Sequence, residues 1–282
     1  MNVIEINNLK FGYKNDKFIF NDFSIKIEEG EIVAFLGENG AGKTTLFKLI
    51  CNLLKAKSGK IFTKETPTLA LSAKQLYDNL TCYENLDFFS RIYKNNINSD
   101  DIENILSSVN LINKKDELIK NLSTGMKQRL NIAKTIATDK KIVVLDEPSS
   151  GLDPVNQIEI STLIKNISTD KTILLSSHNM DEVAQVASRV IFIKNGEILL
   201  NEKMDELNKI LSKNVHIISF KNNTTRNFEE KSFCLSDNMY LMLNDEFYNS
   251  DDVEQVIIRP LTLKDIYILL ESNQYDKFIN LF

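Results

Sequence analysis

Residues 32–50 read IVAFLGENGAGKTTLFKLI, and this stretch decides the fold. The apolar run Ile32–Leu36 predicts a buried strand, and the apolar residues after the loop recur at helical spacing, which predicts a helix from Lys43 to about Lys55. The loop between them holds three of only nine glycines in 282 residues, so we expect each glycine to sit where the backbone demands one. A buried strand that enters a glycine loop and then a helix indicates the α/β class.

Residues 37–44 match the pattern G-x-x-x-x-G-K-[ST] between a strand and a helix, the context that this motif requires. Its glycines let the backbone wrap phosphates, while successive N–H groups and the positive end of the helix point at them. We expect Lys43 to reach the β and γ phosphates and Thr44 to place its hydroxyl on Mg²⁺. The predicted nucleotide-binding residues of this loop are Gly37, Glu38, Asn39, Gly40, Ala41, Gly42, Lys43, Thr44 and Thr45.

A second apolar strand, predicted over residues 142–145, ends in two adjacent carboxylates. Asp146 suits a Mg²⁺ ligand, and Glu147, one residue further out, suits the base that polarises an attacking water. A plain strand that ends in an acidic turn is the alternative. The phosphate loop upstream favours the chemical interpretation.

The remaining apolar patterns place these motifs in one domain. Residues 3–36 alternate apolar and polar positions as strands do, and residues 82–137 follow a helical period, which predicts an inserted helical subdomain at about 73–138. Apolar runs near residues 142 and 172 flank an amphipathic helix, the rhythm of a parallel sheet covered on both faces. Residues 188–200 continue with a hairpin-like turn at 194–197.

The C-terminal part of the chain has a different composition. It has no glycine after Gly196 and, of the four prolines, only Pro260. A helix is predicted over Glu202–Leu211, followed by short strands and a final helix after Pro260. We predict a first domain of residues 1–205 and a small α+β accessory domain of residues 206–282.

Composition excludes several classes of protein. With 43% apolar and 26% charged residues the chain is typical of soluble globular proteins, and no run approaches the roughly 18 to 20 apolar residues that cross a bilayer. The N-terminus lacks a signal-peptide pattern, so we expect a cytosolic chain. The net charge of −5 gives no basic face for nucleic acid, and we predict no nucleic-acid partner. Cys51, Cys82 and Cys234 are scattered and are predicted to be reduced core or near-core residues.

Several further segments resemble the ATP-binding subunits of ABC transporters. Residues 122–130 (LSTGMKQRL) are similar to the signature motif of that family, residues 150–153 resemble its D-loop, and His178 resembles its switch histidine. Tyr13 falls where the family places an aromatic that stacks on adenine. The resemblance covers residues 3–205 and implies an α/β fold: a P-loop NTPase core in which helices flank a mostly parallel sheet, with N-terminal antiparallel strands and an inserted helical subdomain. The small C-terminal α+β appendage is predicted from the pattern of the remaining residues.

The resemblance also implies roles for single residues. Ser123 and Gly125 would offer a hydroxyl and an N–H to the γ-phosphate of a nucleotide held on the other subunit, and Asp153 of the D-loop would join this site. His178 would hydrogen-bond the γ-phosphate and orient the water, leaving Glu147 as the main base. Each position has a simpler alternative: Ser123 as a helix N-cap, His178 as a strand-end histidine and Tyr13 as a half-buried strand aromatic.

Two departures from the family pattern stand out. Thr124 and Met126 replace a glycine and a glutamine of the commonest signature and leave Ser123 intact. The family also has a loop glutamine that contacts the metal and senses the membrane partner. Its position falls at Ser72, and the nearest glutamine is Gln75, so either the loop is shifted or the contact is lost. Gln75 is therefore a candidate third metal contact.

The implied activity is ATP hydrolysis with Mg²⁺ by a subunit that dimerises head to tail, as a homodimer or a heterodimer with a second ATPase subunit. A separate integral membrane permease would insert a short helix into a groove near residues 72–85 and hold the subunit at the inner face of the membrane.

The signature type, the length and residues 259–267 resemble bacterial export ATPases of drug- and peptide-resistance systems. An importer ATPase and a soluble non-transport ABC ATPase are the alternatives.

Overall fold

The computed structural model describes residues 1–14, 17–71, 76–93, 97–220, 232–236, 239–242 and 253–279. The chain divides into two compact units, Met1–Asn201 and Glu202–Phe282. In the described residues, none of the helices is long and apolar enough to span a membrane.

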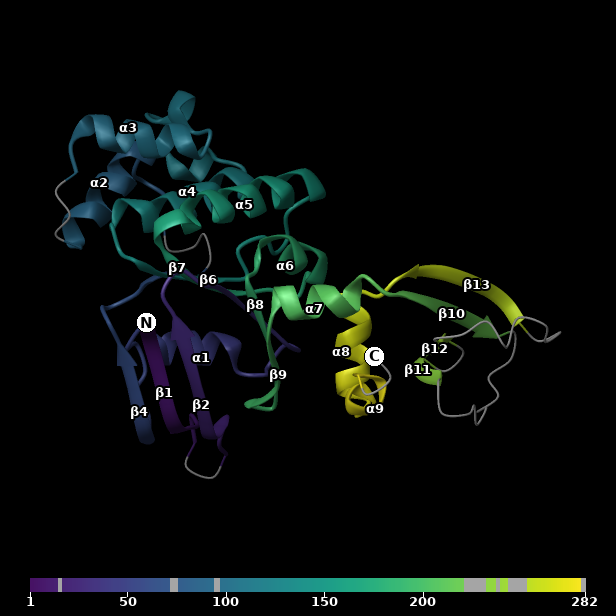
Figure 1. The fold of residues 1–282 in the computed structure, drawn as a ribbon. Helices are drawn as coiled ribbons and strands as arrows, with labels where there is room; N and C mark the ends of the chain where they lie inside the picture. The colour runs from purple at the N-terminus through teal and green to yellow at the C-terminus, as the bar shows by residue number, and fades with distance from the viewer. Residues whose placement is uncertain are drawn as a thin grey trace. The chain divides into compact units, whose positions relative to one another are not determined.

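The described part of the first unit contains two sheets (Figure 1). A three-stranded antiparallel sheet has the order β2-β1-β4, and a six-stranded sheet has the order β5-β6-β7-β3-β8-β9, in which β5, β6, β7, β3 and β8 pair in parallel. The strands are β1 (Asn2–Phe11), β2 (Phe20–Glu28), β3 (Ile32–Leu36), β4 (Ser58–Thr63), β5 (Thr68–Ala70), β6 (Ile142–Asp146), β7 (Thr172–Ser176), β8 (Arg189–Lys194) and β9 (Glu197–Lys203). This arrangement confirms the predicted fold class.

The central strand β3 is buried along its whole length, as its apolar sequence predicts. It lies between β7 and β8, with Ala34 opposite Leu175 and Val190. Each of its larger buried side chains contributes about 1.5–3 kcal/mol, so this strand is firmly fixed in the core. In the parallel register Asp146 of β6 lies opposite Ser176 of β7, so the carboxyl ends of these strands meet at one edge of the sheet.

Helices of the first unit follow the predicted pattern with one correction. They are α1 (Lys43–Ile50), α2 (Cys82–Ile92), α3 (Ser99–Ser108), α4 (Thr124–Ala137), α5 (Pro154–Ile167) and α6 (Met180–Val186). The prediction that α1 continues to about Lys55 is wrong, because Asn52 adopts a left-handed backbone (φ 56°) just after the helix. A capping box between Thr81 and Glu84 starts α2.

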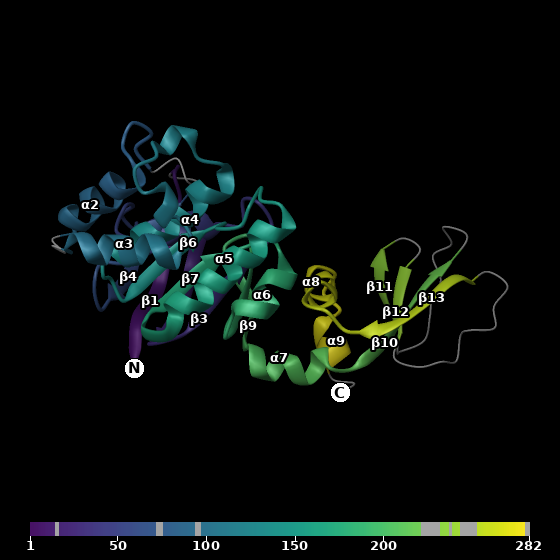
Figure 2. The ribbon, with the colours of Figure 1, turned by 90° about the horizontal axis from the view of Figure 1, so that it is seen from above.

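The second unit is an α+β structure in its described residues. Its strands β10 (Asn214–Phe220), β11 (Ser232–Ser236), β12 (Met239–Met242) and β13 (Val253–Pro260) form a sheet of order β11-β12-β10-β13, and its helices are α7 (Met204–Leu211), α8 (Leu263–Glu271) and α9 (Tyr275–Ile279). Figure 2 shows β10, β12 and β13 side by side. Ile218, Tyr240 and Met242 form a buried cluster on this sheet.

Two local predictions for this region are wrong. The helix begins at Met204 rather than Glu202, because β9 continues to Lys203. Cys51 and Cys82 are buried, but Cys234 is exposed: it lies on β11, at an edge of the sheet, where Phe233 takes the buried side of the alternation. All three cysteines are free, as expected.

Candidate functional site

The loop before α1 wraps around its own lysine. Gly37 has φ 151°, and a Cβ there would lie 2.1 Å from the carbonyl oxygen of Ile193, so only glycine fits this approach to β8. Lys43 Nζ donates to the carbonyl oxygens of Gly37 (2.6 Å) and Glu38 (3.1 Å). Burial lowers the pKa of Lys43, while the nearby carboxylates partly oppose that shift. The loop therefore holds a cation at its centre, where a phosphate can take over the hydrogen bonds.

The acidic end of β6 faces the first turn of α1. Thr44 Oγ1 donates to Asp146 Oδ2 (2.7 Å), and Ser176 Oγ donates to Asp146 Oδ1 (2.6 Å). The backbone N–H of Glu147 donates to the same serine hydroxyl at 2.9 Å. Ser176 thus holds both acidic residues in place, a role that the sequence motifs do not reveal because it depends on the β6–β7 register.

Glu147 adopts an uncommon backbone conformation and meets His178. Its φ is 52°, in the left-handed region that non-glycine residues seldom occupy. His178 Nδ1 lies 2.7 Å from Glu147 Oε2, with the histidine side chain 65% and the glutamate side chain 27% exposed. A strained residue of this kind is held by its surroundings and is frequent at functional sites. The histidine of this pair is therefore exposed, while the glutamate also lines a cavity.

A cavity of about 320 Å³ is lined by many of the predicted nucleotide-binding residues. A larger cavity of about 530 Å³ in the first unit is lined by other residues. The smaller one is lined by Tyr13, Ile19, Asn39, Gly40, Gly42, Lys43, Thr44, Thr45 and Glu147. Tyr13 is 62% exposed, and its hydroxyl lies 3.3 Å from Thr45 Oγ1. Its ring therefore lines the cavity while largely exposed, and it meets the ring of Phe11 in a T-shaped contact with centroids 5.2 Å apart.

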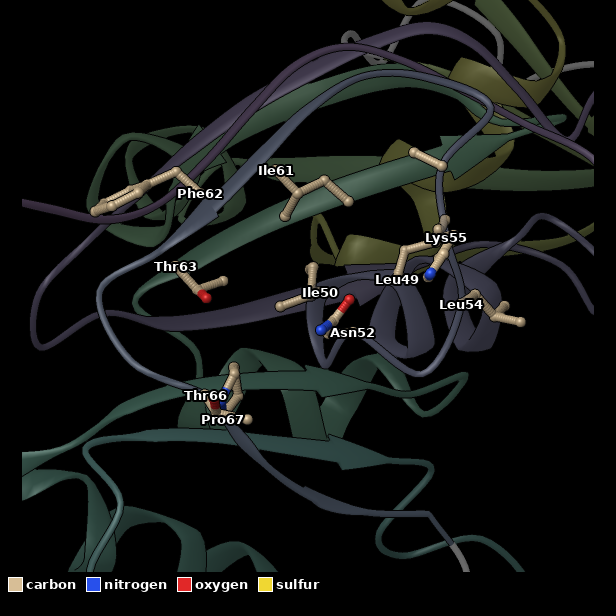
Figure 3. A pocket seen from close by; sticks show the side chains of 11 residues that line it. Leu49, Ile50, Asn52, Leu54, Lys55, Ile61, Phe62, Thr63, Thr66 and Pro67 are labelled. Atoms are coloured by element: carbon tan, nitrogen blue, oxygen red, sulfur yellow. The ribbon is translucent and has the colours of Figure 1, made fainter.

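The larger cavity lies between the end of α1 and β4 (Figure 3). Figure 3 shows Ile50 of α1 and Ile61 of β4 on opposite sides of it. The lining residues are Leu49, Ile50, Asn52, Leu54, Lys55, Ala56, Ile61, Phe62, Thr63, Thr66 and Pro67, none of which belongs to the predicted site.

The donor set beside Lys43 fits Mg²⁺. A threonine hydroxyl and the carboxylate of Asp146 are hard oxygen ligands, and Mg²⁺ sites of this kind are completed by phosphate oxygens and water. Gln75, the candidate third contact, lies outside the described residues, and so does Ser72.

The signature residues lie apart from the Lys43 cavity. Ser123 is the N-cap of α4 and accepts from the N–H of Met126 (3.3 Å), and Asp153 is the N-cap of α5. Asn156 donates to Asp153 and lowers its pKa. A Cβ at Gly125 would lie 2.4 Å from Asn156 Oδ1, so this glycine also allows α4 and α5 to approach closely. None of these residues lines the Lys43 cavity.

The phosphate loop, the strand-end carboxylates and the parallel sheet define the chain as a P-loop nucleotide hydrolase. The family described as ABC transporter matches residues 20–150. YcbN of Bacillus subtilis strain 168, an ABC transporter ATP-binding protein, is 32% identical over 99% of this chain and 96% of its own length. The chain therefore belongs to the ATP-binding proteins of ABC transporters, and it is an ATPase.

Two further similarities bear on what such a subunit does. The lantibiotic transport ATP-binding protein SrtF of Streptococcus pyogenes is 32% identical over 72% of this chain and 92% of its own length. The solved structure of cbiO1 from Clostridium perfringens, part of the ABC transporter complex cbiONQ, superposes with a TM-score of 0.65 at 26% identity, over 74% of this chain and 91% of that one.

Proposed function

We propose that this chain is the ATP-hydrolysing subunit that powers a separate integral membrane permease and exports a hydrophobic or amphipathic compound, such as a drug, a peptide or a lipid-like molecule. ATP hydrolysis is supported by one observation: Lys43, Asp146 and the Glu147–His178 pair lie together at one edge of the sheet. The similarity to SrtF, a lantibiotic transport ATP-binding protein, supports a peptide-like compound, and the resemblance of the signature and of residues 259–267 to export ATPases supports the direction.

The residues around the cavity have distinct roles in this proposal. Tyr13 stacks on the adenine, and the backbone N–H groups of residues 37–45 with Lys43 bind the phosphates. Thr44 and Asp146 would hold Mg²⁺, which neutralises charge on the phosphates when bound. Glu147 accepts the proton of the attacking water, and His178 hydrogen-bonds the γ-phosphate and orients that water.

A second ATPase subunit, either identical or related, would complete the site. Ser123 is the N-cap of α4 and Gly125 lies in its first turn, so the hydroxyl, an N–H and the positive end of the helix would be offered to an anion there. Because these residues and Asp153 do not line the Lys43 cavity of their own chain, a head-to-tail dimer would use them on the nucleotide of the partner.

The permease contact is proposed at the helical subdomain. Tyr77, Phe88 and Phe89 form a cluster of rings with centroids 4.8–5.9 Å apart, and Tyr77 is 49% exposed. An exposed aromatic cluster of this kind is suited to bind an apolar helix. The membership of cbiO1 in a transporter complex supports such a partner, which would hold this subunit at the cytoplasmic face of the membrane.

Co-purification from detergent-solubilised membranes tests the proposal. We expect an integral membrane protein to accompany the tagged chain, and inside-out vesicles that contain both to accumulate the exported compound when ATP is added. Lys43→Ala in the same vesicles is the matched control. Absence of any membrane protein would favour a soluble ABC ATPase, and loss of compound from preloaded vesicles would favour an importer.

A further inference from the structure

Glu182, on α6, is a buried carboxylate that the nucleotide site does not contact directly. The residue is only 4% exposed, and its backbone N–H donates to the side chain of Asn179, the N-cap of the helix. Burial raises the pKa of Glu182, and two serine hydroxyls partly oppose that shift. Burying an acid costs free energy unless hydrogen bonds compensate it, so the partners of this carboxylate are informative.

One oxygen of this carboxylate accepts both of its side-chain hydrogen bonds. Ser149 Oγ donates to Glu182 Oε2 at 2.5 Å, and Ser177 Oγ donates to the same oxygen at 3.0 Å. The other oxygen, Oε1, is buried and accepts no hydrogen bond from the described residues. The structure therefore uses Glu182 as a single acceptor that joins two hydroxyls.

The two serines belong to the segments that carry the reacting side chains. Ser149 lies two residues after Glu147, and Ser177 directly precedes His178. On the open side of these segments Glu147 and His178 meet at 2.7 Å, and on the buried side Glu182 joins the same two segments.

The same region is also tied to the D-loop. Asn179 Nδ2 donates to Gln157 Oε1 at 3.1 Å, and Gln157 Nε2 donates to the carbonyl oxygen of Leu152 at 2.9 Å. The segment that bears His178 is thus held from two directions by side chains that do not touch the nucleotide cavity.

We propose that Glu182 is a positioning residue for ATP hydrolysis, because its carboxylate holds the Glu147 segment and the His178 segment at the separation in which their side chains meet. This inference rests on the proposed role of Glu147 as the base. Other contacts hold the phosphate loop. Loss of the Glu182 carboxylate should therefore slow the chemical step and leave ATP binding unchanged.

Steady-state kinetics of three full-length variants test this role. Glu182→Ala removes the acceptor and is expected to lower kcat about tenfold or more, since a small displacement of a reacting group has effects of this size. The KM and the calorimetric Kd for ATP should stay within about twofold of the parent values. Glu182→Gln keeps an oxygen that can accept both hydroxyls and should retain at least about a third of the parent kcat. Asp181→Ala removes an exposed carboxylate from the same helix and is the matched control.

Ser149→Ala gives an independent measurement that removes one buried oxygen and leaves the carboxylate of Glu182 in place. Its hydroxyl donates only to Glu182 among the described contacts, so kcat should fall about threefold with KM unchanged. The proposal is overturned if Glu182→Ala or Ser149→Ala keeps the parent kcat, if Glu182→Gln is as slow as Glu182→Ala, or if kcat and ATP affinity fall together. Undiminished hydrolysis by Glu147→Gln would instead overturn the role of Glu147, which separates the two failures.

Discussion

Two charged clusters of this protein use similar hydrogen bonds in different ways: an open cluster of Lys43, Asp146, Glu147 and His178 at the nucleotide site, and a closed cluster of Arg259, Thr262 and Asp265 in the second unit. At the nucleotide site the polar groups line an open cavity, and His178, which meets Glu147, is 65% exposed. In the second unit the side chain of Asp265 is only 3% exposed. It accepts hydrogen bonds from Nη1 and Nη2 of Arg259 at 2.7 and 2.9 Å, and it forms a capping box with Thr262. A cluster that is satisfied within itself can only stabilise, whereas one that faces a cavity can exchange its partners for a ligand.

Lys43→Ala tests the open cluster and should have the largest effect. The ammonium now bonded to Gly37 and Glu38 is the group that would turn to the phosphates, so its loss should weaken ATP binding at least about a hundredfold, equivalent to about 3 kcal/mol. Calorimetric titration with ATP measures this. Lys48→Ala, on the same helix but outside the cavity lining, is the control. Unchanged affinity in Lys43→Ala would contradict the assignment of the loop.

Glu147→Gln removes the proposed base and keeps the shape of the side chain. We expect hydrolysis to fall about a hundredfold or more while ATP still binds, because a general base contributes about 10²–10⁴-fold. The variant should accumulate as an ATP-bound dimer, which gel filtration with light scattering would detect. Hydrolysis at the parent rate would remove Glu147 from its proposed role.

Asp265→Ala tests the closed cluster. Burial alone would raise the pKa of Asp265, but the hydrogen bonds from Arg259 and Thr262 outweigh it and lower the pKa. The side chain of Arg259 is 35% exposed and can turn to water when Asp265 is removed, so the lost hydrogen bonds should cost about 1–3 kcal/mol and the second unit should unfold at lower denaturant concentration. Hydrogen exchange of residues 202–279 measures this, with exposed Lys264→Ala as the control. A loss of ATP affinity in Asp265→Ala would show that the two clusters are not independent.

The sequence predicted the residues of the open cluster that lie in continuous motifs, and it missed those that depend on packing. Lys43, Thr44, Asp146 and Glu147 stand at strand ends or in a glycine loop, which local patterns reveal. Ser176 acts through the register of two strands, and Glu182 through burial on a helix that has no motif of its own. The exposure of Cys234 was mispredicted because the strand to which it belongs is short and lies at a sheet edge, which apolar content alone cannot indicate.

Lys134→Met extends the comparison to a buried charge outside the nucleotide cavity, and it has the smallest expected effect of the four variants. Lys134 lies in the first unit, but it is buried, and its ammonium is 4.9 Å from the ring centroid of Phe89 rather than in the nucleotide cavity. Because this ammonium is buried away from the nucleotide cavity, we expect the variant to change stability but not ATP turnover.

The charge of Lys134 lowers the stability of the native state, whereas the charge of Asp265 raises it. Burial lowers the pKa of Lys134 to about 8, from an ordinary value of 10.5, so the charged form is disfavoured in the native state. Below pH 8 the full free-energy cost of burying the charged ammonium is present. As pH rises from about 8, the native pKa, towards 10.5, the unfolded pKa, the unfolded chain binds more protons than the native state, and this cost is relieved. As pH rises from 7 to about 10, the stability of the parent should therefore increase relative to that of Lys134→Met by on the order of 2 kcal/mol. Denaturant unfolding at several pH values measures this, and a constant difference across that range would show that the ammonium is not the cause.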